Sequence, residues 1–260
     1  MQYLCERMQS YTEIDDWTWS ELFKRQKELL GDMPCKEWAE GLKALELNPK
    51  TVPNQAAVSN KLEKLTGWKI FNAEKEFLNS DGWFSALSKK TFPATTYIRK
   101  KHELDFTPFP DLFHEYFGHL PLMGDAQTAR ITKLFAKCYF ATQEKFRAGV
   151  GRLWWHAMEW SFVIEDGKEK VFGAGLLAGK RDFEDALQKP KIKFSLQEAF
   201  HSSKILNTVQ EKYFIHKSLD DLEGMLQDYL QCQLNGEMPF EIARNFDSID
   251  EIDSFRNRGV

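Results

Sequence analysis

The chain has 260 residues, 42% of them hydrophobic and 28% charged, which is enough for one sizeable core. Its net charge of −4 gives no basic bias, so we expect no nucleic-acid partner and no membrane partner. No run approaches the roughly 18 apolar residues of a membrane span, and the N-terminal stretch lacks the apolar segment of a signal peptide.

The cysteines are far apart and include no C-x-x-C pair, so they give neither a zinc-finger nor a thioredoxin signal. They are Cys5, Cys35, Cys138 and Cys232. Without a secretory signal, they indicate reduced thiols in a cytoplasmic protein.

The hydrophobic periodicity predicts a mainly α-helical protein with a few short β-strands. Helices are expected over 12–30, 35–45, 55–66, 81–90, 126–147, 153–164, 181–188, 195–202 and 218–233. Strands are expected over 68–71, 95–99, 170–177 and 212–215. Gly149 and Gly151 are expected to end the helix that begins at 126, and the tail over 236–260 is polar.

Two histidines and an acid lie within six residues, at His114, Glu115 and His119. Neutral imidazole is a common ligand of divalent iron, zinc, copper and nickel, so the pair suggests a metal site. In an ideal helix, residues five apart point about 140° away from each other. The zinc-peptidase pattern uses a spacing of four. Either the helix is distorted near Gly118, or one histidine lies at its end; a zinc peptidase is disfavoured in both cases.

A third metal ligand is needed, and Glu159 is the strongest candidate. It lies in the nearly apolar stretch 153–162, where a carboxylate is costly unless it is paired or bound to a metal. Two histidines and one carboxylate form the facial triad of non-haem Fe(II) oxygenases. The alternatives are that Glu159 pairs with a buried cation or faces solvent, and that His156 is a rival ligand.

The segment from Thr107 to Leu122 resembles the catalytic core of the pterin-dependent aromatic amino acid hydroxylases, T-P-x-P-D-[IL]-x-H-[ED]-x-x-G-H-x-P-L. Further similarities follow in the family's order, and the form at 92–99 is closest to bacterial phenylalanine 4-hydroxylases. They are L-T-G-W at 65–68, F-P-A-T-T-Y-I-R at 92–99, Trp155 with Glu159, G-A-G-L-L at 173–177 and K-P-K at 189–191. The resemblance covers about residues 11–232.

The resemblance implies a single catalytic domain over 11–235, a lead-in over 1–10 and a polar C-terminal extension over 236–260. It implies that His114, His119 and Glu159 hold Fe(II), and that tetrahydrobiopterin or a related tetrahydropterin and O₂ are used to hydroxylate an aromatic amino acid. Conversion of L-phenylalanine to L-tyrosine is the leading hypothesis. A tryptophan or tyrosine hydroxylase, or a catalytically weak paralogue that binds an aromatic metabolite, is the alternative. We expect a monomer.

The resemblance also implies roles around the metal. Arg99 would grip the substrate carboxylate, with Thr107 beside it, and Asp111 would orient His114. The remaining implied contacts are Pro110, His114, Trp155 and Gly175 for the substrate, and Glu115 with Trp83 or Phe84 for the pterin. From the residues alone, Arg99 could equally be a surface strand residue and Asp111 a helix N-cap.

Two departures from the family pattern concern binding rather than the metal. Ala178 and Gly179 stand where the family usually has two serines, and a lost hydroxyl of this kind forfeits roughly 1 kcal/mol. The segment 71–77 is more charged than the usual pterin-binding loop. Leu206 lies near a substrate-selecting position, and its apolar side chain favours phenylalanine.

Overall fold

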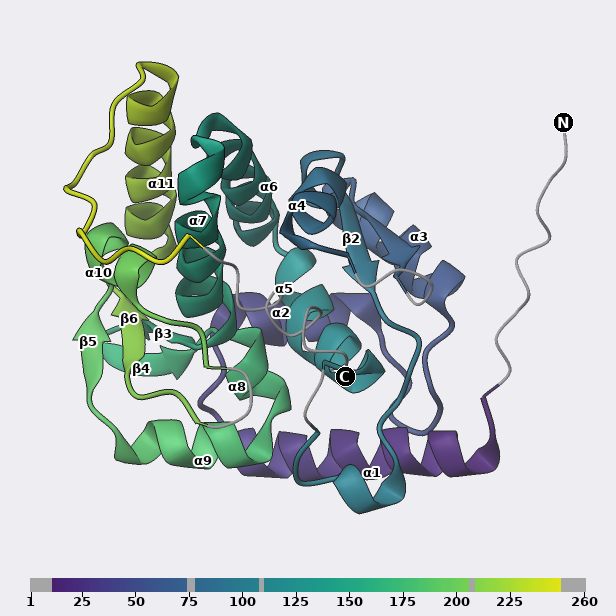
Figure 1. The fold of residues 1–260 in the computed structure, drawn as a ribbon. Helices are drawn as coiled ribbons and strands as arrows, with labels where there is room; N and C mark the ends of the chain where they lie inside the picture. The colour runs from purple at the N-terminus through teal and green to yellow at the C-terminus, as the bar shows by residue number, and fades with distance from the viewer. Residues whose placement is uncertain (1–10, 74–77, 108–109, 206–208, 249–260) are drawn as a thin grey trace, which may run out of the picture.

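The structure is a computed structural model that describes residues 11–73, 78–107, 110–205 and 209–248. The expectations for residues 1–10, Leu206, most of the charged segment 71–77 and the end of the C-terminal extension lie outside these ranges. The described chain is mainly helical with a few short strands, as expected (Figure 1).

The bounds of the helices and strands are as follows. The α-helices are α1 (Glu13–Leu30), α2 (Lys36–Leu45), α3 (Gln55–Thr66), α4 (Ser80–Ser88), α5 (Leu120–Met123), α6 (Ala126–Ala141), α7 (Arg147–Trp154), α8 (Ala174–Ala178), α9 (Lys180–Gln188), α10 (Leu196–His201) and α11 (Leu219–Leu234). The strands are β1 (Lys69–Asn72), β2 (Thr91–Ala94), β3 (Ser161–Glu165), β4 (Lys168–Val171), β5 (Lys191–Lys193) and β6 (Tyr213–His216). Short helical turns η1 (Lys101–Glu103), η2 (His114–His119), η3 (Glu144–Phe146) and η4 (Trp155–Glu159) connect them.

The helix boundaries follow the capping residues of the sequence. Thr12 and Asp15 form a reciprocal capping box at the start of α1, which satisfies two backbone donors that would otherwise lack partners. The side chain of Asn54 caps α3, and Gly67 ends that helix with a φ of 76°, a conformation that glycine adopts without strain. These helices were expected at nearly these positions.

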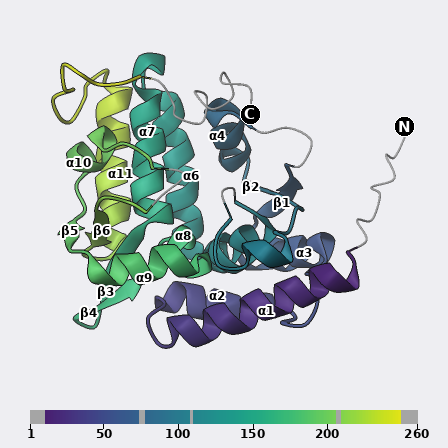
Figure 2. The ribbon, with the colours of Figure 1, turned by 60° about the horizontal axis from the view of Figure 1, so that its bottom comes forward.

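A helical bundle and a small sheet form one side of the molecule. Figures 1 and 2 show α6, α7 and α11 side by side, above the four-stranded sheet β4-β3-β6-β5. In this sheet, β3 pairs antiparallel with β4 and parallel with β6, and β6 pairs parallel with β5. Strand β5 was not anticipated from the sequence. Strands β1 and β2 form a separate parallel pair beside α3 and α4.

The expected strand over 95–99 is wrong, because the paired strand β2 lies just before it. The backbone groups of 95–99 bond to side chains and to a distant loop instead of a neighbouring strand. The N–H of Arg99 donates to Asp111 Oδ2 at 2.9 Å, and the N–H of Leu112 donates to the carbonyl of Tyr97 at 2.6 Å. The chain over 95–99 is extended, as its composition suggests, but its hydrogen-bond partners lie in the segment that carries the two histidines.

Gly149 and Gly151 do not break a helix, contrary to the expectation, since both lie inside α7. A Cβ on Gly149 would come within 2.2 Å of the Phe200 ring, so glycine is required there for α10 to pack against α7. The helix expected over 153–164 is also wrong, because α7 ends at Trp154 and the chain continues through η4 into β3. The expected strand over 170–177 ends at Val171, and α8 follows it.

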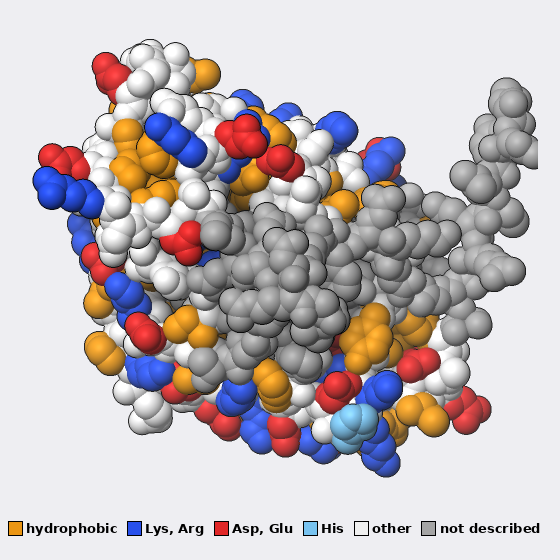
Figure 3. All heavy atoms as spheres, in the orientation of Figure 1, with side chains coloured by type: hydrophobic (Ala, Val, Ile, Leu, Met, Phe, Trp, Pro, Cys, Tyr) orange, Lys and Arg blue, Asp and Glu red, His pale blue; other side chains and the backbone are white. Residues whose placement is uncertain are grey.

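The described part of the C-terminal extension, 236–248, packs onto the bundle. The Phe246 ring stacks on Phe200 with centroids 5.3 Å apart, and Arg152 Nη2 donates to the carbonyl of Asp247 at 2.7 Å. Basic and acidic side chains are interspersed over the described surface seen in Figure 3. None of the helices in the described ranges is long and apolar enough to cross a membrane.

Candidate active site

His114 and His119 lie at the two ends of the π-helical turn η2. The N–H of Leu120 donates to the carbonyl of Glu115, five residues earlier, so this turn is wider than a turn of α-helix. Such a turn brings residues five apart onto one face, and the two Nε2 atoms lie 3.1 Å apart. The helix is therefore distorted, which was one of the two arrangements expected from the spacing.

Packing from two other helices holds η2 in this form. A Cβ on Gly118 would come within 2.7 Å of the carbonyl oxygen of Ala174, so the glycine allows α8 to lie directly against the turn. On another side, Trp38 Nε1 in α2 donates to the carbonyl of Phe117 at 2.7 Å. A carbonyl of the widened turn thus has a partner from outside its own helix, as buried carbonyls require.

Glu159 lies at the end of the second π-helical turn, η4, and its carboxylate faces both histidines. Its Oε1 is 3.0 Å from His119 Nε2, and its Oε2 is 3.5 Å from His114 Nε2. Trp154 Nε1 donates to Oε1 at 3.2 Å and orients the carboxylate. The alternative that Glu159 pairs with a buried Lys or Arg, or faces solvent, does not hold.

Burial and mutual attraction set the charges of this group. Burial favours a neutral carboxyl on Glu159, but His119 outweighs it and holds the pKa of Glu159 below its usual value. Burial lowers the pKa of His114 to about 4, so its ring is neutral at pH 7 and its lone pair is free. Burial alone would also lower the pKa of His119, but the carboxylate of Glu159 raises it.

These three side chains fit a divalent metal ion. The two imidazole nitrogens lie 3.1 Å apart, and each lies 3.0–3.5 Å from one oxygen of the Glu159 carboxylate, as neighbouring ligands of one ion do. This donor set suits Fe(II) and leaves further coordination positions open for other molecules. A cation at the centre would also take the place of the proton that Glu159 otherwise attracts to His119. His156, the rival ligand, points to Ser202 O, from which its Nε2 is 3.2 Å away.

Glu115 is a second carboxylate close to the histidine pair, because one of its oxygens lies within 4.8 Å of the histidine ligand atoms. Burial raises the pKa of Glu115 to about 8, so it is largely neutral at pH 7 and a weaker metal ligand than Glu159. Its Oε2 is buried and has no partner among the described residues. This carboxyl is therefore available to a molecule bound beside the metal.

Arg99 and Asp111 form a buried bidentate pair beside the metal-ligand group. Arg99 Nε and Nη2 each donate to Asp111 at 2.9 Å, and the two side chains are 5% and 0% exposed. Asp111 Oδ1 also accepts from the backbone N–H of His114 at 3.1 Å. Asp111 therefore reaches His114 through the backbone rather than the ring, in the manner of a helix N-cap. Arg99 is not a surface residue.

Two tryptophans form a wall near Glu159. Trp155 is half-buried, its Nε1 donates to Gln210 Oε1 at 3.0 Å, and its ring centroid lies 5.5 Å from that of Trp160. A Cβ on Gly175 would come within 2.7 Å of the Trp160 ring, so this glycine lets α8 approach the wall closely.

The other side chains expected near the substrate differ in exposure. Thr107 is half-buried and Pro110 is exposed, while the two residues between 107 and 110 lie outside the described ranges. Ala178, at the end of α8, is only 3% exposed and offers no hydroxyl. The described part of this side of the site therefore contains fewer polar groups than the family pattern implies.

The two aromatic candidates for pterin stacking have different surroundings. Phe84 is 2% exposed and stacks on Tyr139, with ring centroids 4.2 Å apart and planes at 18°. Trp83 is half-buried and contacts Phe92 and Trp154 only edge-on, at 5.5 and 6.2 Å. A planar ligand needs a free ring face, so Trp83 is the better candidate of the two.

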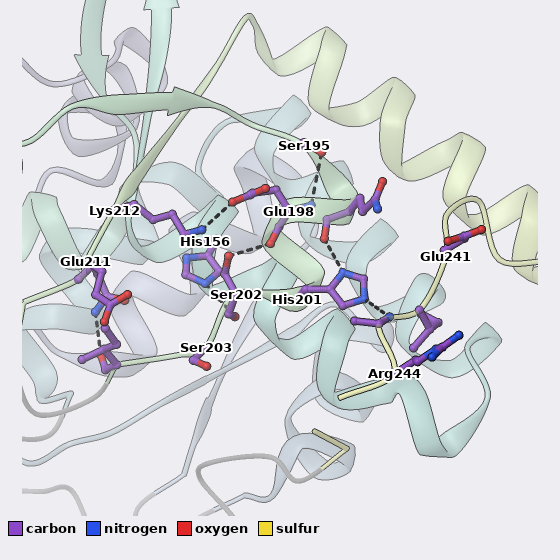
Figure 4. Close-up of a pocket in the computed structure, with 15 residues that line it drawn as sticks. His156, Ser195, Glu198, His201, Ser202, Ser203, Glu211, Lys212, Glu241 and Arg244 are labelled. Atoms are coloured by element: carbon purple, nitrogen blue, oxygen red, sulfur yellow. Dashed lines mark hydrogen bonds and ion pairs between the residues drawn. The ribbon is translucent and has the colours of Figure 1, made fainter. Parts of the chain in front are cut away.

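A cavity of about 880 Å³ lies beside His156, between α10 and the chain over 241–244 (Figure 4). Its walls are polar and include the ion pair between Lys212 and Glu198, 2.6 Å apart. None of the three metal-ligand candidates lines it, and its hydroxyl and charged groups do not suit an aromatic ring.

Comparison with known proteins agrees with this geometry. Residues 6–257 match the family described as biopterin-dependent aromatic amino acid hydroxylase. The chain belongs to this family. The phenylalanine-4-hydroxylases of Caulobacter vibrioides and Chromobacterium violaceum are each 30% identical to it, over 85% and 84% of this chain and 76% and 75% of theirs.

Solved hydroxylase structures share the fold. The phenylalanine hydroxylase of Chromobacterium violaceum with bound iron(III) and 7,8-dihydrobiopterin has a TM-score of 0.80 and 28% identity, covering 93% of this chain and 90% of that chain. The phenylalanine hydroxylase of Legionella pneumophila also has a TM-score of 0.80, with 27% identity over 92% of this chain and 96% of that chain. The mainly helical hydroxylase domain expected from the sequence is confirmed.

Two side chains that contribute to this hydroxylase site are not expected from the sequence. Trp154 orients Glu159, and Trp160 lies against Gly175 with a buried Nε1 that has no partner among the described residues. Trp154 directly precedes Trp155, and Trp160 directly follows Glu159. The sequence places both tryptophans in a regular helix over 153–164. The distortion at η4 that turns them toward the site leaves no local signal in the sequence.

Proposed function

We propose that this protein is an Fe(II)- and tetrahydropterin-dependent monooxygenase that converts L-phenylalanine to L-tyrosine. The observation that carries the proposal is the convergence of His114, His119 and Glu159 on one point, 3.0–3.5 Å from one another. The proposal is further supported by the relatives named phenylalanine-4-hydroxylase and by the related structure with iron(III) and 7,8-dihydrobiopterin.

The three ligand candidates would hold the iron on one face and leave the opposite face to the reactants. Iron and reduced pterin, when bound, supply the activation of O₂ and the electrons that a monooxygenase needs. The chain supplies neutral imidazole from His114 and a carboxylate that Trp154 holds in place. This arrangement keeps the ligand geometry constant while the reactants exchange.

The substrate would lie between the buried guanidinium of Arg99 and the wall formed by Trp155 and Trp160. Arg99 uses Nε and Nη2 for Asp111, which leaves Nη1 free among the described contacts for the carboxylate of an amino acid. The ring of the substrate would lie against Trp155, His114 and Pro110, because flat apolar surfaces suit an aromatic ring. Thr107 and Gly175 would complete this side.

The pterin would lie on the side of Trp83 and Glu115. The half-buried Trp83 ring would stack on the pterin, and the carboxyl of Glu115 would form a hydrogen bond to it at Oε2. We further propose a monomer that acts in the cytoplasm, with a catalytic domain over 11–235 and no nucleic-acid or membrane partner.

A product assay tests the proposal. The iron-loaded protein is incubated with tetrahydrobiopterin, O₂ and, separately, L-phenylalanine, L-tryptophan or L-tyrosine, and products are separated by chromatography. We expect tyrosine from phenylalanine. Preferential formation of 5-hydroxytryptophan or dopa would instead assign one of the alternative substrates. Oxidation of pterin without any hydroxylated product would contradict the proposal and favour a weak paralogue, which the missing hydroxyl at Ala178 would then explain.

A further inference from the structure

A second group of metal-ligating side chains lies outside the active site, where α2 meets the β3–β4 hairpin. Cys35 directly precedes α2, Glu37 lies in its first turn, and Glu165 ends β3. One ligand atom from each of the three lies within 4.8 Å of the other two. Cys35 and Glu37 are 0% and 7% exposed, while Glu165 is half-buried.

The backbone around this group holds the three side chains in place. The N–H of Cys35 donates to the carbonyl of Val171 at 2.9 Å, and the N–H of Val171 donates to the carbonyl of Met33 at 2.8 Å. The N–H of Lys36 lies 3.1 and 3.3 Å from the two carboxylate oxygens of Glu165. The segment before α2 is thus attached to β4, and Glu165 is attached to the first turn of α2.

One oxygen of this group lacks a partner. Glu37 Oε2 is buried and has no hydrogen bond to any described residue, and the nearest cation, the exposed Lys36, is 3.8 Å from the other oxygen. Burial and then Glu165 raise the pKa of Glu37 to about 7, and burial also raises the pKa of Cys35. Two carboxyl groups and a thiol in one buried place are unfavourable when ionised unless a cation joins them.

We propose that Cys35, Glu37 and Glu165 bind a divalent cation that accepts sulfur ligands, namely Zn²⁺. One thiolate and two carboxylates are ligands that zinc accepts in tetrahedral sites, and the fourth position would be taken by water. The thiolate disfavours Mg²⁺ and Ca²⁺, which prefer oxygen alone. Binding would satisfy Glu37 Oε2 and release the protons that Glu37 and Cys35 otherwise retain.

The position of this site gives it a structural role. Trp38, in the same turn of α2, donates to Phe117 O in η2, and β3 begins two residues after Glu159. The ion would therefore join the two elements that support the two π-helical turns of the active site. The proposal does not depend on the hydroxylase activity.

Cobalt(II) tests the proposal, because it replaces zinc and gives a near-ultraviolet charge-transfer band only when a thiolate is bound. The full-length protein is treated with chelator and titrated with Co²⁺. The active-site donors His114, His119 and Glu159 contain no sulfur, so cobalt bound there gives no such band. We expect a thiolate band whose final amplitude corresponds to one thiolate-bound ion per chain, whether or not the active site also takes up cobalt, and which disappears when Zn²⁺ is added.

The variants assign the band to its ligands. Cys35→Ser is expected to abolish it, and Glu37→Gln is expected to weaken cobalt binding at least roughly tenfold. Cys232→Ser, at a half-buried cysteine outside the group, is the matched control and keeps the band. If Cys35→Ser does not fold, Glu165→Gln replaces it and is expected to weaken cobalt binding as Glu37→Gln does; unchanged cobalt binding in both would overturn the proposal. Absence of the band in the wild type, or its persistence in Cys35→Ser, would overturn the proposal.

Discussion

The two sides of the active site differ in how their polar groups are satisfied. On the metal side, His114, His119 and Glu159 face one another, and a single ion can satisfy all three. On the side expected to bind the substrate carboxylate, Arg99 is already paired with Asp111. Metal binding therefore depends on the chemical identity of three donors. Binding of the substrate carboxylate depends on how Asp111 and the substrate share the Arg99 guanidinium.

The largest effect is expected on the metal side, from Glu159→Gln. The amide keeps the shape of the side chain but removes its charge, so we expect iron content and tyrosine formation to fall below detection. Iron is measured by elemental analysis and tyrosine by chromatography. Glu223→Gln, at a half-buried carboxylate in α11 that pairs with Arg130, serves as a control that keeps both. Retention of iron and turnover by Glu159→Gln would show that another carboxylate, such as Glu115, is the third ligand.

On the carboxylate side, Asp111→Asn is expected to destabilise the metal-free protein by about 3–5 kcal/mol, because it leaves Arg99 buried without a counter-charge. Denaturant unfolding measures this change. Glu46→Gln, which breaks the exposed ion pair with Lys61, is expected to cost much less, because solvent screens an exposed pair. Equal losses in the two variants would contradict the view that burial makes the Arg99 pair different.

His216 is a buried histidine outside the metal-ligand group, so it shows the effect of burial on a histidine pKa. Burial lowers the pKa of His216 to about 4, and its Nε2 lies 3.2 Å from the carbonyl of Ala157. The unfolded chain binds a proton on this group near pH 6.5 and the folded chain near pH 4, so folding free energy is lost as the pH falls through that window.

We expect His216→Gln to remove on the order of 2 kcal/mol of this pH dependence between pH 6.5 and 4.5. The measurement is denaturant unfolding of the metal-free wild type and variant at both pH values. The difference in stability between them should shrink toward acid pH. A difference that does not change with pH would mean that His216 is not held neutral by burial.

Alanine substitutions at two glycines perturb the two sides separately. Each is expected to lower the free energy of unfolding by about 1–3 kcal/mol. Gly118→Ala pushes on Ala174 O next to η2, so we expect weaker iron binding. Gly175→Ala pushes on the Trp160 ring, so we expect a higher KM for phenylalanine with normal iron content. Gly224→Ala in α11 meets no atom within 4 Å and is the control. Identical effects of the first two variants would argue against two separable sides.

The smallest effect is expected from Ala178→Ser, which restores the hydroxyl that the family usually has. A new hydrogen bond to the substrate or its neighbours contributes about 1 kcal/mol, so the KM for phenylalanine should fall roughly fivefold. Steady-state kinetics at saturating pterin measure it. Gly179→Ser, at the neighbouring position, tests whether any added hydroxyl has the same effect. An unchanged KM would mean that Arg99 alone determines carboxylate binding.

Much of this site could be predicted from the sequence, because its chemistry depends on residue types at fixed positions. The histidine pair and Glu159 were identified from their apolar surroundings and from a resemblance that spans most of the chain. The π-helical geometry could not be derived, since sequence periodicity distinguishes helix from strand but not a wide turn from a regular one. The structure supplies the reason for the spacing of five.

The errors in the fold have a common physical cause. Gly149 resembles a helix breaker in the sequence, but its role is set by Phe200, which contacts its Cβ position from a helix about fifty residues later. Arg99 lies in extended chain without a strand, because Asp111 satisfies its backbone N–H. In the same way, no local pattern relates Cys35 to Glu165. Long-range packing decides each case, and a single sequence does not display it.

The wide turn at η2 also determines which length changes the chain can tolerate. Deleting one residue between His114 and His119 would leave a spacing of four, which puts both rings on one face of a regular α-helix. The metal pair would survive, and the residues after it would keep their orientation, because the wide turn would become a regular one. Deleting a residue directly after His119 would instead rotate the residues that follow by about 100°. Gly41, whose Cβ position lies 1.8 Å from Pro121 O, leaves no room for such a rotation of α5 against α2. The chain can therefore lose one residue inside the wide turn, but not directly after it.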